Sequence, residues 1–130
     1  MRTTKEHFKL FKKECKYWLD RFDLGSWRAD IRHYTRSNLI EGTFAYCDSD
    51  WAMRTCCIGL QVKLSDDAIV NKKVISKAAF HEVCELLLHM LRIIAETDAK
   101  PTMMDEINGY THAIIRRMEK AIWEPYWRGK

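Results

Sequence analysis

The chain has 130 residues, the size of a single domain (residues 1–130), and 47% of them are hydrophobic, enough to build one core. Its net charge of +4, from 22 basic and 18 acidic residues mixed along the chain, argues against a dedicated nucleic-acid-binding protein. The five cysteines form no CxxC pair, which argues against a disulfide scaffold or a four-cysteine zinc site. The N-terminus lacks an apolar signal-like run and no stretch is apolar enough to cross a bilayer, so we expect a cytoplasmic protein with no membrane partner.

The first predicted element is an amphipathic helix. Thr3 and Glu6 have the spacing of a capping box, and Gly25 is a suitable terminator. Apolar residues recur between them at intervals of three and four, which defines one buried face. That face contains Phe8, Phe11, Cys15, Trp18, Leu19 and Phe22. We interpret the lysines on the other side of this helix as solvated surface.

Three strands are predicted next, because the hydrophobic period changes from three-four to two at Trp27. The first strand begins there, the second covers residues 42–47 and the third covers residues 51–64. The composition of residues 48–50, Asp-Ser-Asp, predicts a hairpin turn between the second and third strands. The connections are short, which favours an antiparallel meander.

Two helices complete the predicted fold. The first covers residues 74–96 and is broken before Pro101. The second starts near Thr102 and is expected to end at Pro125, leaving the last residues as a tail. The sequence therefore predicts an α+β fold with an N-terminal helix, a three-stranded antiparallel sheet and two packed helices.

The central helix carries its polar groups in a narrow stripe that includes His81, Glu82 and Glu85. At 100° per residue, its core face is predicted to contain Phe80, Val83, Cys84, Leu87, Leu91 and Ile94. His81 and Glu85 are one turn apart, so their side chains project together, as two ligands of one metal ion must. Glu82 lies one step away, a position from which a carboxylate can deprotonate a water molecule at the metal. The alternative is that these residues are only the polar side of an amphipathic helix.

The last helix offers a third ligand for such a site. Asp105, Glu106 and His112 are the metal-capable residues it supplies. His112 lies at the margin of an apolar stripe, so an antiparallel helix could direct it toward His81. The set would then be two histidines and one glutamate, which is a known zinc donor set. The sequence leaves open whether His112 or Glu106 completes the site.

With this layout and this HExxE motif, the chain resembles the compact SprT-like and related zincin-like metallopeptidases, and more narrowly small phage-encoded proteins of that type. Residues 79–87 and 111–119 carry the resemblance. It implies metal binding by His81, with Glu82 as general base and Glu85 at the position of the family's second histidine. It also implies His112 as the third ligand, zinc as the metal, and a peptide or protein substrate. Because a carboxylate replaces an imidazole, the site could favour another divalent ion.

Two other functions remain open at this point. A catalytically degenerate member of such a family could act as a binding module on a host protein, in the host cytoplasm if the chain is phage-encoded. Alternatively, Arg28, Arg32 and Arg36 could bind nucleic acid beside stacking aromatic residues. Asp30 and the modest net charge make nucleic-acid binding the least favoured of these hypotheses.

Overall fold

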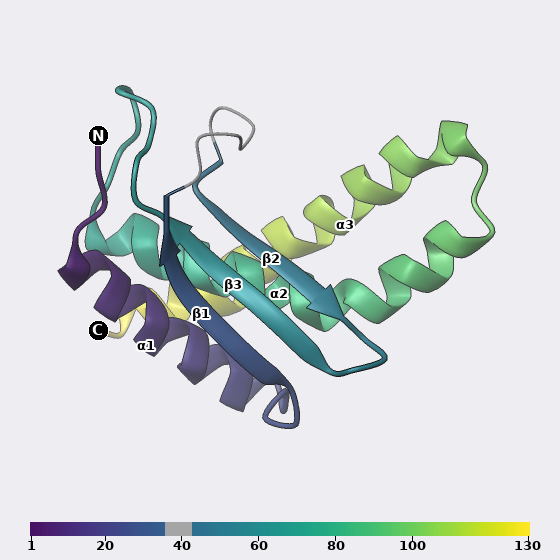
Figure 1. Ribbon diagram of the computed structural model, residues 1–130, viewed down its shortest axis with the longest axis horizontal. Coiled ribbons are helices and arrows are strands. Elements are labelled where there is room, and N and C mark those ends of the chain that lie inside the picture. The colour runs from purple at the N-terminus through teal and green to yellow at the C-terminus, as the bar shows by residue number, and fades with distance from the viewer. Residues whose placement is uncertain (36–42) are drawn as a thin grey trace.

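The computed structural model describes residues 1–35 and 43–130 and confirms the α+β fold class (Figure 1). Arg36 and the start of the strand predicted at residue 42 lie outside the described residues. No helix in the described ranges is long and apolar enough to cross a membrane. The elements in chain order are α1 (Lys5–Arg21), β1 (Arg28–Tyr34), β2 (Ala45–Asp50), β3 (Thr55–Gln61), α2 (Lys72–Thr97), η1 (Pro101–Met103), α3 (Met104–Met118), η2 (Glu119–Trp123) and α4 (Glu124–Arg128).

The sheet is mixed, so the prediction of a purely antiparallel meander is wrong. Its strand order is β1-β3-β2, and only β2 and β3 are antiparallel. Strand β1 runs parallel to β3, from Arg28 opposite Thr55 to Tyr34 opposite Gln61. The prediction failed because it paired strands that are consecutive in sequence, whereas β3 is inserted between β1 and β2.

The turn between β2 and β3 lies later than the sequence predicted. Asp48 and Asp50 are strand residues whose side chains are exposed, a position where charge is tolerated in a sheet with one solvated face. The turn follows them: the backbone N–H of Met53 donates to Asp50 Oδ1 at 3.1 Å, and Arg54 adopts a positive φ of 51°. Asp48 and Asp50 therefore lie just before the turn and not within it.

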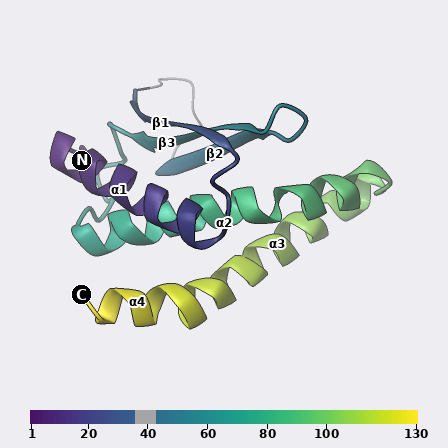
Figure 2. The same cartoon turned by 90° about the horizontal axis from the view of Figure 1, so that it is seen from below.

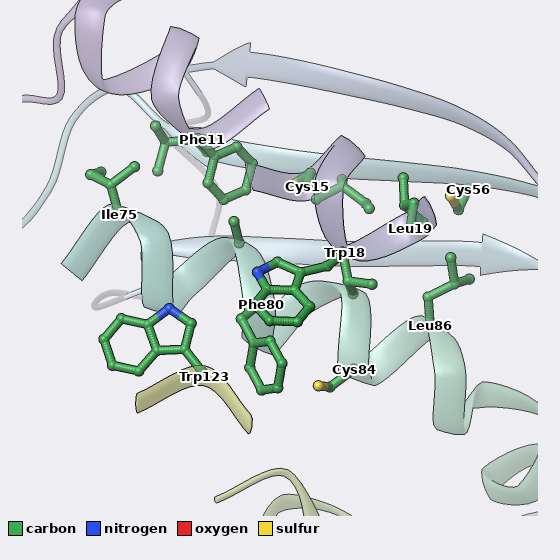
Figure 3. Packing of buried hydrophobic residues seen from close by; sticks show 14 of the residues in the cluster. Phe11, Cys15, Trp18, Leu19, Cys56, Ile75, Phe80, Cys84, Leu86 and Trp123 are labelled. Carbon is green, nitrogen blue, oxygen red and sulfur yellow. The ribbon is translucent and has the colours of Figure 1, made fainter. Parts of the chain in front are cut away.

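Helices α1 and α2 lie together against one face of the sheet, and α3 with its continuation lies on the far side of α2 (Figure 2). Helix α1 is capped by Thr4 and His7 rather than by Thr3 and Glu6. Its apolar face packs on α2 through Phe11, Trp18 and neighbouring side chains, and Trp18 meets Phe80 edge to face at 4.7 Å (Figure 3). These contacts hold the N-terminal half of α2 rigidly in place.

Pro125 does not end the last helix, contrary to the prediction. The helix widens into one π turn, η2, and then continues as α4. Proline has no N–H to donate and its ring crowds the carbonyl one turn earlier, and a wider turn relieves both problems. The residues predicted to be a tail pack on α1, where Tyr126 stacks on Tyr17 with ring centroids 4.9 Å apart.

A buried polar network fixes this C-terminal segment against the first two helices. Glu14 of α1 is 1% exposed and accepts hydrogen bonds from Ser76, Tyr126 and Lys130. The Ser76 hydroxyl in turn accepts the indole N–H of Trp123 at 3.0 Å. Because a buried carboxylate is costly unless it is paired, these partners oppose separation of the two ends of the chain.

The C-terminal half of α2 extends beyond the sheet and, with the start of α3, forms a two-helix arm over residues 88–110 (Figure 1). Leu91 and Ile94, predicted to be core residues, are 68% and 64% exposed. Helix α1 ends at Arg21 and does not reach this part of α2, so the apolar stripe continues without a cover. Periodicity identified the stripe correctly, but it could not show where the covering helix ends.

Candidate metal centre

Helices α2 and α3 bring together the three residues predicted as ligands, His81, Glu85 and His112. One donor atom from each lies within 4.8 Å of the other two. Glu85 Oε1 is 3.7 Å from His81 Nε2 and 3.3 Å from His112 Nε2. Donors about 2.0–2.1 Å from a tetrahedral zinc ion are about 3.3 Å apart, so these separations fit a shared metal ion with small adjustments. A group of this kind could bind a metal.

Both imidazoles are oriented by hydrogen bonds at the nitrogen that faces away from Glu85. His81 Nδ1 lies 3.4 Å from Glu119 Oε2, and His112 Nδ1 lies 2.9 Å from the backbone carbonyl oxygen of Asn108. A carbonyl oxygen can only accept, so the Nδ1 of His112 carries a proton, and Nε2 is the atom that could bind a metal. Outer hydrogen bonds of this kind are typical of metal-binding histidines.

Electrostatic interactions within the group compensate for its partial burial. Hydrogen bonds with Glu119 and then Glu85 raise the pKa of His81 to about 10, against the opposing effect of burial. Burial would raise the pKa of Glu85, but its hydrogen bonds with His81 and Glu82 outweigh burial and lower that pKa. The group is therefore an ion-pair network in which the His81 imidazolium lies between Glu85 and Glu119.

Glu82 has a different environment from the three convergent residues. It is 6% exposed, and its Oε2 atom is buried without a hydrogen-bond partner in the described structure. Burial, the Glu85 charge and a hydrogen bond with Glu85 all raise its pKa. An unsatisfied buried carboxylate oxygen is costly in a folded protein, which favours a role for it in binding or chemistry.

A cleft of about 330 Å³ lies beside His81 and Glu82, and its lining includes neither Glu85 nor His112. The start of β2 borders one side through Phe44 and Ala45, and Glu119 of η2 borders the other. His81 and Glu82 line the cleft together, so a ligand bound there would meet both side chains.

The other sequence predictions about functional residues have mixed outcomes. Glu106 is exposed and does not belong to the convergent group, whereas His112 does. Sequence reasoning missed Glu119, although it follows His112 by two helical turns and so lies on the same face of the helix. Of the arginines considered for nucleic-acid binding, Arg32 is paired with Asp30 at 2.6 Å.

Comparisons of the chain with protein-family models, with curated proteins and with solved structures found no match.

Proposed function

We propose that this protein is a zinc-dependent hydrolase of peptide bonds, similar in its site to the SprT-like metallopeptidases. The observation that carries the proposal is the convergence of two imidazole Nε2 atoms on Glu85 Oε1, with both Nδ1 atoms held by other groups. A divalent cation bound by this donor set would acidify water and polarise a carbonyl group. Two histidines and one glutamate form a donor set used by catalytic zinc sites.

Glu82 is the general base in this proposal. It would accept a proton from the attacking water and deliver it to the amine nitrogen that leaves. Its unpartnered Oε2, next to His81 in the wall of the cleft, supports this role, and the charge of a bound divalent cation would lower the pKa that burial raises. Glu85 is assigned to metal binding because it faces both histidines, whereas Glu82 is not part of the convergent group.

Metal content is the first test. Elemental analysis of protein purified without added metal should find about one divalent ion per chain, because three donors converge on one point. The His81→Ala variant should lose this ion. The His89→Gln variant is the matched control, since His89 lies two turns further along α2 and outside the group. A wild-type protein that binds no zinc above background in a titration would refute the proposal.

Hydrolysis requires a separate test. The Glu82→Gln variant should keep its metal and lose cleavage of an unfolded protein substrate, whereas Glu85→Gln should lose metal affinity first. This difference separates the base from the ligand. Cleavage by Glu82→Gln at the wild-type rate would remove Glu82 from the mechanism.

The exposed arm favours one other candidate function, a binding module for a host protein. Met90, Ile93 and Ile94 line a groove of about 540 Å³ against the β2–β3 turn, and Leu91 adds exposed apolar surface nearby. Apolar patches of this kind often mark protein contacts. Under this alternative, chelation would change neither thermal stability nor partner binding, whereas Ile94→Glu would abolish the latter.

A further inference from the structure

We infer that the cleft beside Glu82 binds the C-terminal residue of a peptide, through an apolar side chain and a free α-carboxylate. This inference rests on the proposed function and adds a substrate class to it. The protein would then act as a carboxypeptidase that removes apolar residues. Two properties of the cleft carry the inference, its apolar lining and the position of Lys77.

The lining of the cleft suits one apolar side chain. Phe44 and Ala45 from the β2 side and Val74 and Ala78 from α2 provide its uncharged surface. The volume of about 330 Å³ is at the lower end of the range for small-molecule sites. The cleft therefore has room for one apolar side chain.

Lys77 provides a cation for a carboxylate in the same cleft. It lies one helical turn before His81, so the two side chains project on the same side of α2. Its Nζ atom is 5.7 Å from the ring centroid of Trp123, and none of the ion pairs between residues of the described ranges includes it. Of the other charged groups in the lining, Glu119 is engaged by His81, and Glu82 by Glu85.

The spacing of these groups matches the end of a peptide chain. Side chains one helical turn apart are separated by about 5–6 Å at Cβ, and one extended residue spans about 3.5 Å. If the scissile carbonyl lies beside His81 and Glu82, the α-carboxylate of the following residue comes within reach of the flexible Lys77 stem. An internal peptide segment would place a neutral amide there, whereas a C-terminal residue would give the exposed Lys77 ammonium a carboxylate partner.

The reaction is hydrolysis of the last peptide bond. Water adds its oxygen to the carbonyl carbon, the C–N bond breaks, and the proton accepted by Glu82 passes to the amine nitrogen that leaves. The products are a shortened peptide with a new carboxylate and one free amino acid. No oxidant, reductant or co-substrate other than water is needed.

A binding experiment tests the inference independently of turnover. The probes are 2-mercaptomethyl-3-phenylpropanoate and its primary amide, which share a thiol for the metal and a benzyl group for the cleft. Calorimetric titration into zinc-loaded protein should show the acid binding about fivefold more tightly than the amide, because it forms a charged contact with the exposed Lys77. The Lys77→Met variant should reduce this preference to less than about twofold, while Lys73→Met, changed at an exposed lysine one turn earlier, should retain it.

The outcomes separate this inference from the proposed function. Equal affinity for the two probes in wild-type protein, or an acid preference that persists in Lys77→Met, would overturn the inference and leave the metal site intact. Absence of binding by either probe to zinc-loaded protein would also overturn it. A protein that does not take up zinc would instead refute the proposed function, and this inference with it.

Discussion

Replacing Glu119 by leucine should weaken metal binding without removing any of the three ligands. Glu119 Oε2 lies 3.4 Å from His81 Nδ1, and its side chain is only 11% exposed. Loss of this contact would free the imidazole to rotate and would no longer favour the tautomer with its lone pair on Nε2. Changes to such outer partners typically cost 10–100-fold in metal affinity, which corresponds to about 1.4–2.7 kcal/mol. The Glu119→Gln variant keeps an acceptor oxygen and should fall at the lower end of this range.

The assay is a competition titration with a chelator of known zinc affinity, together with nitrogen chemical shifts of the His81 imidazole. The shifts should show the Nδ1–H tautomer in zinc-loaded wild-type protein and a change in Glu119→Leu. A purely structural role for Glu119 would not alter this tautomer. Glu124→Gln is a suitable control because Glu124 is exposed one turn later on the same helix.

The proposed role of Glu119 would be refuted if Glu119→Leu bound zinc as tightly as the wild-type protein. It would also fail if affinity fell in Glu119→Leu and Glu124→Gln alike. If Glu119→Leu does not fold, Glu119→Gln carries the test, since it preserves the shape of the side chain.

Three further predictions concern protonation and packing. Zinc binding at pH 8 should release about one proton, because the pKa of about 10 keeps His81 protonated in the protein without zinc. Calorimetry in two buffers of different ionisation enthalpy measures the number of protons released, and zero release would contradict the prediction. Gly59→Ala should lower the free energy of unfolding by about 1–3 kcal/mol, because the added methyl group would collide with the Tyr46 ring. Urea titration measures this change, and an unchanged midpoint of urea unfolding would disprove the collision. Ser76→Ala should lower the free energy of unfolding by about 1–3 kcal/mol, since the hydroxyl donates to Glu14 and accepts the indole N–H of Trp123. An unchanged free energy of unfolding in the same urea titration would mean that other groups replace these hydrogen bonds.

Local periodicity accounts for the parts of the fold that the sequence predicted well. The buried face of α1, the alternating Cys56, Ile58 and Leu60 of β3, and the break before Pro101 all follow from neighbouring residues. Strand order does not, because it depends on which segments meet after the chain has crossed from one sheet edge to the other. The exposure of Leu91 likewise depends on the length of α1, a distant element.

The candidate site shows the same division between local and distant information. His81 and Glu85 share one helix, so their spacing alone places them together. Placing His112 beside them required the packing of α3 on α2, which the sequence permitted but did not fix. Glu119 was missed because its role depends on the direction of the His81 ring, and no sequence pattern specifies that direction.

The division of the site between two helices has a mechanical consequence. Helix α2 supplies His81 and Glu85, whereas His112, Asn108 and Glu119 come from α3 and η2. A bound ion would therefore act as a cross-link between the two helices at the base of the arm. We expect zinc to slow amide hydrogen exchange throughout the arm, with less effect on α1 and the sheet. The ion would then rigidify the two-helix arm in addition to its proposed role in hydrolysis.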